Sequence, residues 1–161
     1  MLELVSPDCD RHEEWLKSHR EWGPGLHEEG FAVRAGDDLE SAEVFSAWVE
    51  WLHSGPETFW WIIEGDAVLG GIALRPYSEI DHRVIGHIGY GIRPSARRRG
   101  VATWALTEVL CRARDAAMPG CGLVCRDANL ASIKTIERCG GVLQQTLEDG
   151  HGLARHYWVA L

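Results

Sequence analysis

The chain has 161 residues, 45% of them hydrophobic and 25% charged, which suits one soluble globular domain with a buried core. No apolar run approaches the roughly 20 residues of a membrane helix, and the first residues lack the basic and apolar regions of a secretory signal. We therefore expect a single domain over residues 1–161, with no membrane partner and a cytoplasmic location.

The net charge of -8 is unevenly distributed along the chain. Residues 1–66 carry 16 acids and 4 bases, whereas residues 67–161 carry 8 acids and 12 bases. This asymmetry predicts an anionic ligand for the second segment and a cationic ligand for the first. Solvated helix faces would explain the acids of the first segment equally well.

Five cysteines are present, and none forms a Cys-x-x-Cys pair: Cys9, Cys111, Cys121, Cys125 and Cys139. Structural zinc sites use closely spaced cysteine pairs with a matching histidine set. The spacing here favours reduced thiols without a metal site.

The N-terminal part of the chain predicts one strand and two helices. Leu2–Val5 alternates briefly and reads as a short strand, and an amphipathic helix is expected from Ser6 to Trp22. A second helix is expected from about Asp38 to His53, where apolar residues recur at three- and four-residue steps. Trp48 and Trp51 fall on that apolar stripe, so we interpret both as core residues.

Three strands follow in the middle of the chain. Thr58–Glu64 and Ala67–Leu74 are rich in apolar and β-branched residues and flank a Gly-Asp turn, which predicts a hairpin. A polar loop, Pro76–Arg83, leads to a third strand from Val84 to Ile92.

The last part alternates helices and strands. A helix is expected from about Val101 to Ala117, a short buried strand over Gly122–Cys125, and a helix from about Leu130 to Arg138. Two closing strands follow, at about Val142–Leu147 and Ala154–Ala160. The order predicts an α/β protein with a mixed, mostly antiparallel central sheet of about seven strands, flanked by about four helices.

A basic turn between the third predicted strand and the next helix has the features of a phosphate site. Arg97, Arg98 and Arg99 precede Gly100, and the helix begins at once. The N-terminus of a helix presents free N–H groups and the positive end of the helix dipole. Gly100 lets the backbone approach an anion closely, and the small Ala102 keeps the first turn open.

This segment, Arg97-x-x-Gly100-x-Ala102, resembles the Arg/Gln-x-x-Gly-x-Gly/Ala motif of the GNAT acetyltransferases. In that family the backbone amides of the motif hold the diphosphate of coenzyme A, which implies Arg97, Arg98, Arg99, Gly100, Val101 and Ala102 here. The preceding strand binds the pantetheine arm, which implies Gly91 and Ile92.

A second motif lies at the distance that the resemblance requires. Asn129-x-x-Ser132 opens the next helix, and in this family an Asn there lies near the thiol end of the cofactor. A helix N-cap explains both residues as well. The resemblance spans most of the chain and is densest from Gly86 to Gly141. In that segment the sequence is similar to one bacterial branch of predicted acetyltransferases.

The resemblance implies that acetyl-CoA serves as co-substrate and that an amine attacks its thioester directly in a ternary complex. A backbone N–H near Ile92 is the expected oxyanion donor. The family's usual tyrosine acid corresponds to Ile136 here, so Tyr90 and Tyr157 are the candidate acids. Cys139 and Ser132 are weaker candidates. Water could also protonate the thiolate, because a free thiol has a pKa of about 8.5.

The general base is expected just before or within the third predicted strand. Some relatives place a Glu where this chain has Gly86, and its neighbour His87 has a suitable unperturbed pKa of about 6.5. Strict alternation would put His87 on the face of Gly89 and Gly91, and a bulge would change that. Glu79, Asp81 and His82 in the preceding loop are further candidates.

Two other functions remain open from the sequence. The same fold could bind acyl-CoA without catalysis, as a sensor or interaction module. A nucleic-acid site at Arg97–Arg99 is disfavoured by the negative net charge. The acceptor is expected to be an amine, cationic if the acidic segment attracts it, and the resemblance is compatible with a homodimer.

Overall fold

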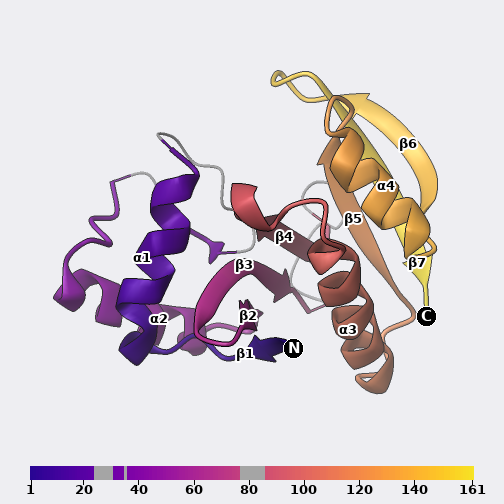
Figure 1. The fold of residues 1–161 in the computed structure, drawn as a ribbon. Helices are drawn as coiled ribbons and strands as arrows, with labels where there is room; N and C mark the ends of the chain where they lie inside the picture. Colours follow the sequence, from indigo (N-terminus) through magenta and orange to yellow (C-terminus); the bar gives the residue numbers. More distant parts are fainter. Residues whose placement is uncertain (24–30, 35, 77–85) are drawn as a thin grey trace. The chain divides into compact units, whose positions relative to one another are not determined.

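The computed structural model describes residues 1–23, 31–34, 36–76 and 86–161 (Figure 1). The strands and helices are β1 (Leu2–Val5), α1 (His12–Glu21), α2 (Ala42–Ser54), β2 (Thr58–Glu64), β3 (Ala67–Leu74), β4 (Ile88–Ile92), α3 (Val101–Asp115), β5 (Gly120–Arg126), α4 (Leu130–Arg138), β6 (Val142–Glu148) and β7 (Leu153–Ala160). Short 3-10 turns lie at Cys9–Arg11 and Pro94–Ala96. Within the described ranges the chain has seven strands and four helices, and the predicted α/β class is confirmed.

The seven strands are shared between two sheets. A four-stranded sheet has the order β1-β2-β3-β4, and a three-stranded sheet has the order β5-β7-β6. The chain forms two compact units: the first contains Met1–Ala73 and Tyr90–Ala102, and the second contains Leu74–Gly89 and Thr103–Leu161. No helix in the described ranges is long and apolar enough to cross a membrane.

The first unit is organised around an antiparallel pair with a fixed register. β1 pairs with β2 so that Leu2 lies opposite Glu64 and Val5 opposite Trp61. The β2–β3 connection is the predicted tight turn, where Gly65 has a φ of 61°. Glycine adopts this left-handed conformation without the steric cost of a Cβ.

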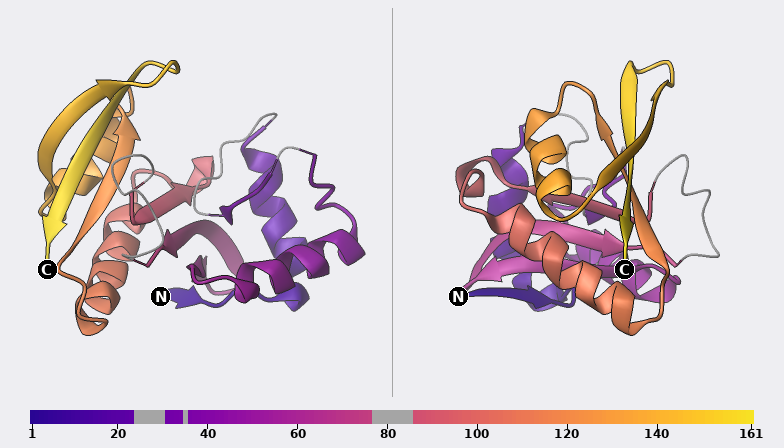
Figure 2. Two further views of the ribbon diagram at one scale, coloured as in Figure 1. Left: turned by 180° about the vertical axis from the view of Figure 1, so that it is seen from behind. Right: turned by 90° about the vertical axis from the view of Figure 1, so that its right-hand side faces the viewer.

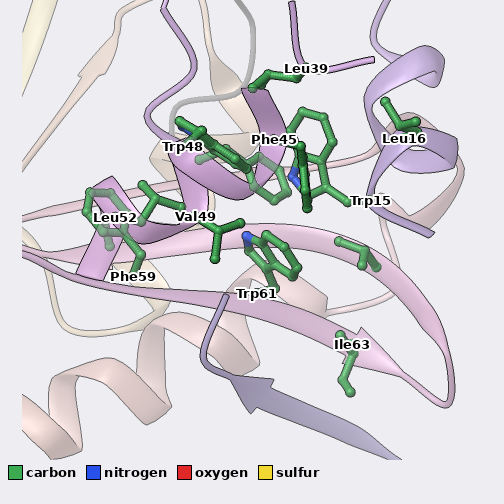
Figure 3. Close-up of a cluster of buried hydrophobic side chains, with 13 residues drawn as sticks. Trp15, Leu16, Leu39, Phe45, Trp48, Val49, Leu52, Phe59, Trp61 and Ile63 are labelled. Atoms are coloured by element: carbon green, nitrogen blue, oxygen red, sulfur yellow. The ribbon is translucent and has the colours of Figure 1, made fainter. Parts of the chain in front are cut away.

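Aromatic side chains form the core of the first unit (Figure 3). Trp15 of α1 packs against Phe45 and Trp48 of α2, with ring centroids 5.3 and 5.1 Å apart. Trp61 of β2 lies 6.0 Å from Phe45, so both helices are joined to the sheet through the same cluster. Aromatic pairs of this kind add stability to a core beyond that expected from the apolar area they bury. Trp48 is buried, as predicted.

The second unit contains the three-stranded sheet and helix α4 (Figure 2). β7 lies in the middle and pairs antiparallel with both β5 and β6. The β6 ladder has an irregularity between Leu143 and Gln145. Helix α4 packs against β5 and buries Ile133 and Ile136. Leu123 of β5 is also fully buried.

Several predicted boundaries differ from the structure for local reasons. The helix predicted from Ser6 begins at His12, because the 3-10 turn capped by Asp8 precedes it. The helix predicted from Asp38 begins at Ala42, because Ser41 acts as its N-cap. β5 is longer than predicted and runs from Gly120 to Arg126.

The third predicted strand is shorter than expected. β4 begins at Ile88, and Gly86 has a φ of 72°, which is incompatible with an extended strand. Residues 84 and 85 lie outside the described ranges, as do most of the polar loop and its candidates Glu79, Asp81 and His82. His87 precedes the strand, so the predicted alternation of side chains does not apply to it.

Candidate functional site

The chain between β4 and α3 forms a short irregular turn in the first unit (Figure 1). After the 3-10 turn at Pro94–Ala96, Arg97 is extended and Arg98 has a φ of 60°. Gly100 has a φ of 80°, and α3 begins at the next residue. Two left-handed residues within three positions redirect the chain into the helix, which leaves the first helical N–H groups without intrahelical acceptors.

The space beside Gly100 is open. A Cβ added there would meet no atom within 4 Å beyond those of its two chain neighbours, and the residue is exposed. Val101 is buried and anchors the helix start, whereas Ala102 is half-buried. A helix N-terminus with an open approach, preceded by a residue that has no side chain, can accept a phosphate group.

The three arginines of the turn have different surroundings. Arg97 donates from Nε to the carbonyl oxygen of Ile92 at 2.9 Å, and its guanidinium lies 5.0 Å from the centre of a Trp22 ring. Arg99 forms an ion pair with Glu64 at 2.6 Å. Arg98 is exposed and has no ion pair among the described residues. Of the three, Arg98 has the guanidinium most accessible to an added anion.

Gly91 and Ile92 lie on β4 directly before this turn, and both are buried. β3 approaches them closely at Gly70: a Cβ added to Gly70 would lie 2.3 Å from the carbonyl oxygen of Gly91 and 2.9 Å from Cδ1 of Ile92. The N–H of Arg93 donates to Leu69 at 2.8 Å. The backbone of the predicted pantetheine-binding segment is therefore positioned by a glycine on its neighbouring strand.

Asn129 and Ser132 lie at the start of α4 in the second unit. The Asn129 side-chain oxygen accepts the N–H of Ser132 at 3.1 Å, which is the N-cap interaction expected from the sequence. The cap uses the amide oxygen of Asn129, and its exposed amide nitrogen has no hydrogen bond among the described residues. This group could donate to a ligand while the cap stays intact.

His87 is fully buried and bonded to β5 in the second unit. Its N–H donates to the carbonyl oxygen of Gly122 at 2.7 Å, and its ring nitrogen Nδ1 accepts the N–H of Gly122 at 2.8 Å. Since Nδ1 is an acceptor, the proton of the neutral ring lies on Nε2. In this tautomer, two hydrogen bonds to Gly122 join His87 to β5.

Gly86 has no room for the carboxylate that some relatives carry at its position. A Cβ added there would lie 2.9 Å from the carbonyl oxygen of Gly122, and the φ of 72° is unfavourable for any other residue. The local backbone explains why the position is a glycine in this chain.

Tyr157 of β7 is buried in the second unit, with its hydroxyl donating to Glu137 of α4 at 3.1 Å. Burial raises the pKa of Tyr157 above its ordinary value; Glu137 adds to the increase and Arg155 opposes it. The phenol therefore stays protonated over the neutral range, but its proton is already shared with Glu137.

The predicted site residues fall into two groups. Tyr90, which is half-buried, continues directly into the predicted cofactor-binding residues from Gly91 to Ala102 within the first unit. The other candidates, His87, Asn129, Ser132 and Tyr157, belong to the second unit. Each group is internally ordered by the hydrogen bonds described above.

Glu21 is a residue at this site that sequence patterns did not indicate. At the C-terminus of α1, it accepts hydrogen bonds from Arg93 and Ser95, more than 70 positions along the chain. An acid in a helix rich in acids carries no periodic signal of such a long-range contact. The Trp22 ring beside Arg97 was likewise not expected.

A separate groove of about 230 Å³ lies on the first unit beside α2. It is lined by Arg34, Asp37, Val44, Ala47, Trp48 and Trp51. Trp51 is 40% exposed, so its predicted burial in the core is wrong; the guanidinium of Arg34 covers its ring at 4.0 Å.

Comparisons with solved structures show the same fold in known acetyltransferases. One is a RimL ribosomal L7/L12 alpha-N-protein acetyltransferase in complex with coenzyme A, with a TM-score of 0.79 and 17% identity over 99% of this chain and 94% of that chain. Another is the microcin C7 self-immunity acetyltransferase MccE in complex with acetyl-CoA and AMP, with a TM-score of 0.76 and 16% identity over 99% of this chain and 92% of that chain. A third is a chimera of the Vibrio cholerae spermidine N-acetyltransferase SpeG with hSSAT, with a TM-score of 0.70 and 16% identity over 99% of this chain and 95% of that chain. No curated protein matches this chain in sequence.

The sequence profile of the Acetyltransferase (GNAT) family matches residues 13–141, which include α1 from its second residue, the turn before α3 and the whole of α4. The match covers most of the chain and contains both motifs on which the resemblance depended. The chain therefore belongs to the GNAT acetyltransferase family.

Proposed function

We propose that the enzyme, an acetyl-CoA-dependent N-acetyltransferase, transfers the acetyl group by direct attack of an amine in a ternary complex. The observation that carries the cofactor assignment is the turn before α3. It combines free helical N–H groups, the open approach beside Gly100 and the exposed guanidinium of Arg98. Backbone donors and a nearby cation suit the diphosphate of coenzyme A.

The proposed reaction breaks one bond and forms one. The lone pair of a neutral amine attacks the thioester carbonyl carbon, the carbonyl oxygen becomes an oxyanion, and the C–S bond then breaks. The amine loses one proton and the coenzyme A thiolate gains one. The Arg93 N–H already donates to Leu69, so the proposed oxyanion donor is an N–H of β4 at Ile92 or before it.

The catalytic assignments differ in their structural support. His87 and Tyr157 both hold hydrogen bonds that order the second unit, which supports a positioning role for each. Tyr90 adjoins Gly91 on β4, so it is the proposed acid that lies nearest in sequence to the predicted cofactor backbone. A water molecule is the alternative proton donor to the thiolate.

The proposed acceptor is a cationic amine. Support comes from the 16 acids and 4 bases of residues 1–66, since a negative surface raises the local concentration of a cation. Two of the similar structures are named for acceptors of this chemical type, a protein N-terminus and spermidine. An amine must lose its proton before attack, so the expected rate rises with pH towards the pKa of the amine.

Calorimetric titration of acetyl-CoA tests the cofactor site. Gly100→Glu places an anion where the diphosphate is proposed to lie, and the matched control is Gly150→Glu. Gly150, in the β6–β7 turn, has a φ of 81° and the same open surroundings, so backbone strain and added charge are equal in the two variants. We expect binding by wild type and Gly150→Glu and none by Gly100→Glu. Absence of binding to wild-type protein freed of copurified coenzyme A would contradict the proposal.

The alternative function is a catalytically silent acyl-CoA-binding module. The usual tyrosine position is Ile136, which is buried in the second unit, and this keeps the alternative open. Thiol release from acetyl-CoA across a panel of amines distinguishes the two functions. Cofactor binding without release for any amine would favour the silent module.

We propose further that the protein forms a homodimer through β6. β6 is an edge strand in which every residue is exposed, with Val142, Leu143 and Leu147 exposed by 62, 44 and 45%. It carries no charge from Val142 to Leu147, and a two-fold antiparallel pairing about Gln145 would place Leu143 opposite the partner's Leu147. Uncharged edge strands of this length favour pairing with another chain.

Sedimentation velocity tests the dimer. We expect wild type to sediment as a dimer and Leu143→Lys as a monomer. The control is Val44→Lys, at a valine of α2 that is 40% exposed. A monomeric wild type would contradict this part of the proposal.

The single domain over residues 1–161 and the cytoplasmic location stay predictions.

A further inference from the structure

The C-terminus of α1 holds the segment that leads into the proposed diphosphate-binding turn. Glu21 receives three hydrogen bonds from this segment: Arg93 Nη2 donates to Oε1 at 2.5 Å, Ser95 Oγ donates to Oε1 at 3.0 Å, and the Ser95 N–H donates to Oε2 at 3.2 Å. Both carboxylate oxygens are used. All these atoms belong to the first unit, so the contacts are local to one compact body.

Arg93 connects the same contacts to β3. Its Nη1 donates to the carbonyl oxygen of Val68 at 3.1 Å, and its Nε donates to Ser95 Oγ at 3.0 Å. The side chains of Arg93 and Glu21 are only 18% and 28% exposed. Charge-assisted hydrogen bonds with this degree of burial are stronger than exposed ion pairs.

Trp22, the next residue after Glu21, contacts the turn itself. The Arg97 guanidinium lies over a Trp22 ring at 5.0 Å, while Arg97 Nε donates to Ile92. These contacts direct the Arg97 side chain back towards α1 and β4. We call the set Glu21, Trp22, Arg93, Ser95 and Arg97 the α1 brace.

The turn beyond the brace has a conformation that requires support. Arg98 has a φ of 60°, in the left-handed region that costs a non-glycine residue about 1–3 kcal/mol. Such conformations persist where the surrounding contacts determine them. A turn ordered before binding also avoids the entropy cost of ordering it around a ligand.

We propose that Glu21 and Trp22 are positioning residues that preorganise the diphosphate-binding turn, so that α1 sets the affinity for diphosphate-containing donors. The inference rests on the proposed function, because it assigns the turn to coenzyme A. It predicts that loss of the brace weakens binding of the diphosphate part of the donor and leaves binding of its pantetheine part unchanged.

The test compares two donors in the Glu21→Gln variant. Acetyl-CoA contains the diphosphate, whereas S-acetylpantetheine has the same thioester and arm without it. We expect the Kd for acetyl-CoA to rise roughly tenfold, the size expected for loss of a charge-assisted hydrogen bond. The Kd for S-acetylpantetheine, measured by NMR titration, is expected to stay the same.

Electrostatics alone predicts the opposite sign. Removing a negative charge near a bound diphosphate would strengthen anion binding, so weaker binding in Glu21→Gln reports the loss of positioning. Glu40→Gln is the matched control, because it removes the same charge from an exposed ion pair with Arg20 of α1. We expect it to leave both Kd values unchanged.

Trp22 provides a second, independent test. Trp22→Ala is expected to raise the Kd for acetyl-CoA, and Trp22→Phe to restore most of the affinity, because a phenyl ring also offers a flat face to the Arg97 guanidinium. Wild-type affinity in both Glu21→Gln and Trp22→Ala would overturn the inference and leave the proposed function intact. Equal weakening of both donors would also overturn it, since the brace would then support the whole fold. Failure of wild type to bind acetyl-CoA would instead refute the proposed function.

Discussion

The N–H of Gly122 donates a 2.8 Å hydrogen bond to Nδ1 of His87, and the ring that accepts it is fully buried. The His87 N–H in turn donates to the carbonyl oxygen of Gly122. The two residues therefore join the chain just before β4 to β5 through both main chain and side chain. A histidine proposed as a base from its position in the sequence thus has a structural partner for the nitrogen that a base would use.

Substitution of His87 separates its structural role from a catalytic one. His87→Ala removes the ring and leaves the Gly122 N–H without its acceptor, so we expect the free energy of unfolding to fall by about 2–4 kcal/mol. His87→Asn keeps an acceptor oxygen near the position of Nδ1 and is expected to lose less stability. Chemical denaturation measures both. If His87→Asn folds stably but loses more than about a hundredfold in kcat/KM, His87 is the base after all.

Gly70→Ala is expected to weaken both stability and cofactor binding. The added Cβ would overlap the Gly91 carbonyl oxygen at 2.3 Å, so β4 must move. Forced packing of this kind costs about 1–3 kcal/mol. Thermal unfolding and acetyl-CoA titration measure the two effects, and Gly55→Ala is the control, because a Cβ there meets its nearest atom at 4.0 Å. Wild-type cofactor affinity in a folded Gly70→Ala would argue against Gly91 and Ile92 as the pantetheine-binding segment.

The contribution of Glu21 to stability is expected to depend on pH. Burial alone would raise the pKa of Glu21, but hydrogen bonds from Arg93 and Ser95 outweigh it and hold the pKa below its ordinary value. A lowered folded-state pKa means that the stabilisation is present above the unfolded pKa of about 4.3 and is lost as the pH falls through the folded pKa. The Tm difference between wild type and Glu21→Gln should therefore be larger at pH 7 than at pH 3. A difference that does not change with pH would contradict an ionised Glu21 in the brace.

The cysteines are expected to react in a fixed order with an alkylating reagent. Cys9 and Cys111 are exposed, whereas burial raises the pKa of Cys121 to about 12. Because the thiolate is the reactive form, mass spectrometry after brief alkylation at pH 8 should find Cys9 and Cys111 modified and Cys121 intact. Early labelling of Cys121 would show that β5 opens readily. The two exposed thiols also set the background of any assay that detects released coenzyme A.

Local sequence signals were sufficient for most of the secondary structure. The hairpin Thr58–Glu64 and Ala67–Leu74 was predicted with its observed bounds, because alternation and a Gly-Asp turn act over a few residues. The turn from Arg97 to Ala102 was recognised as an anion site for the same reason: its three arginines, glycine and helix start are contiguous. The N-cap role of Asn129 also follows from its immediate neighbours.

Tertiary structure alone decided how those residues are used. All three arginines look alike in the sequence, yet Arg97 contacts Trp22 and Arg99 pairs with Glu64. Among the described residues, Arg98 has no ion pair and is exposed, so its guanidinium is available to an anion. The partners are distant in the chain, and no periodic pattern records such contacts. The same holds for Glu21 with Arg93 and for His87 with Gly122. Local physics specifies the elements and the motif, whereas side-chain roles depend on which surfaces the packed core brings together.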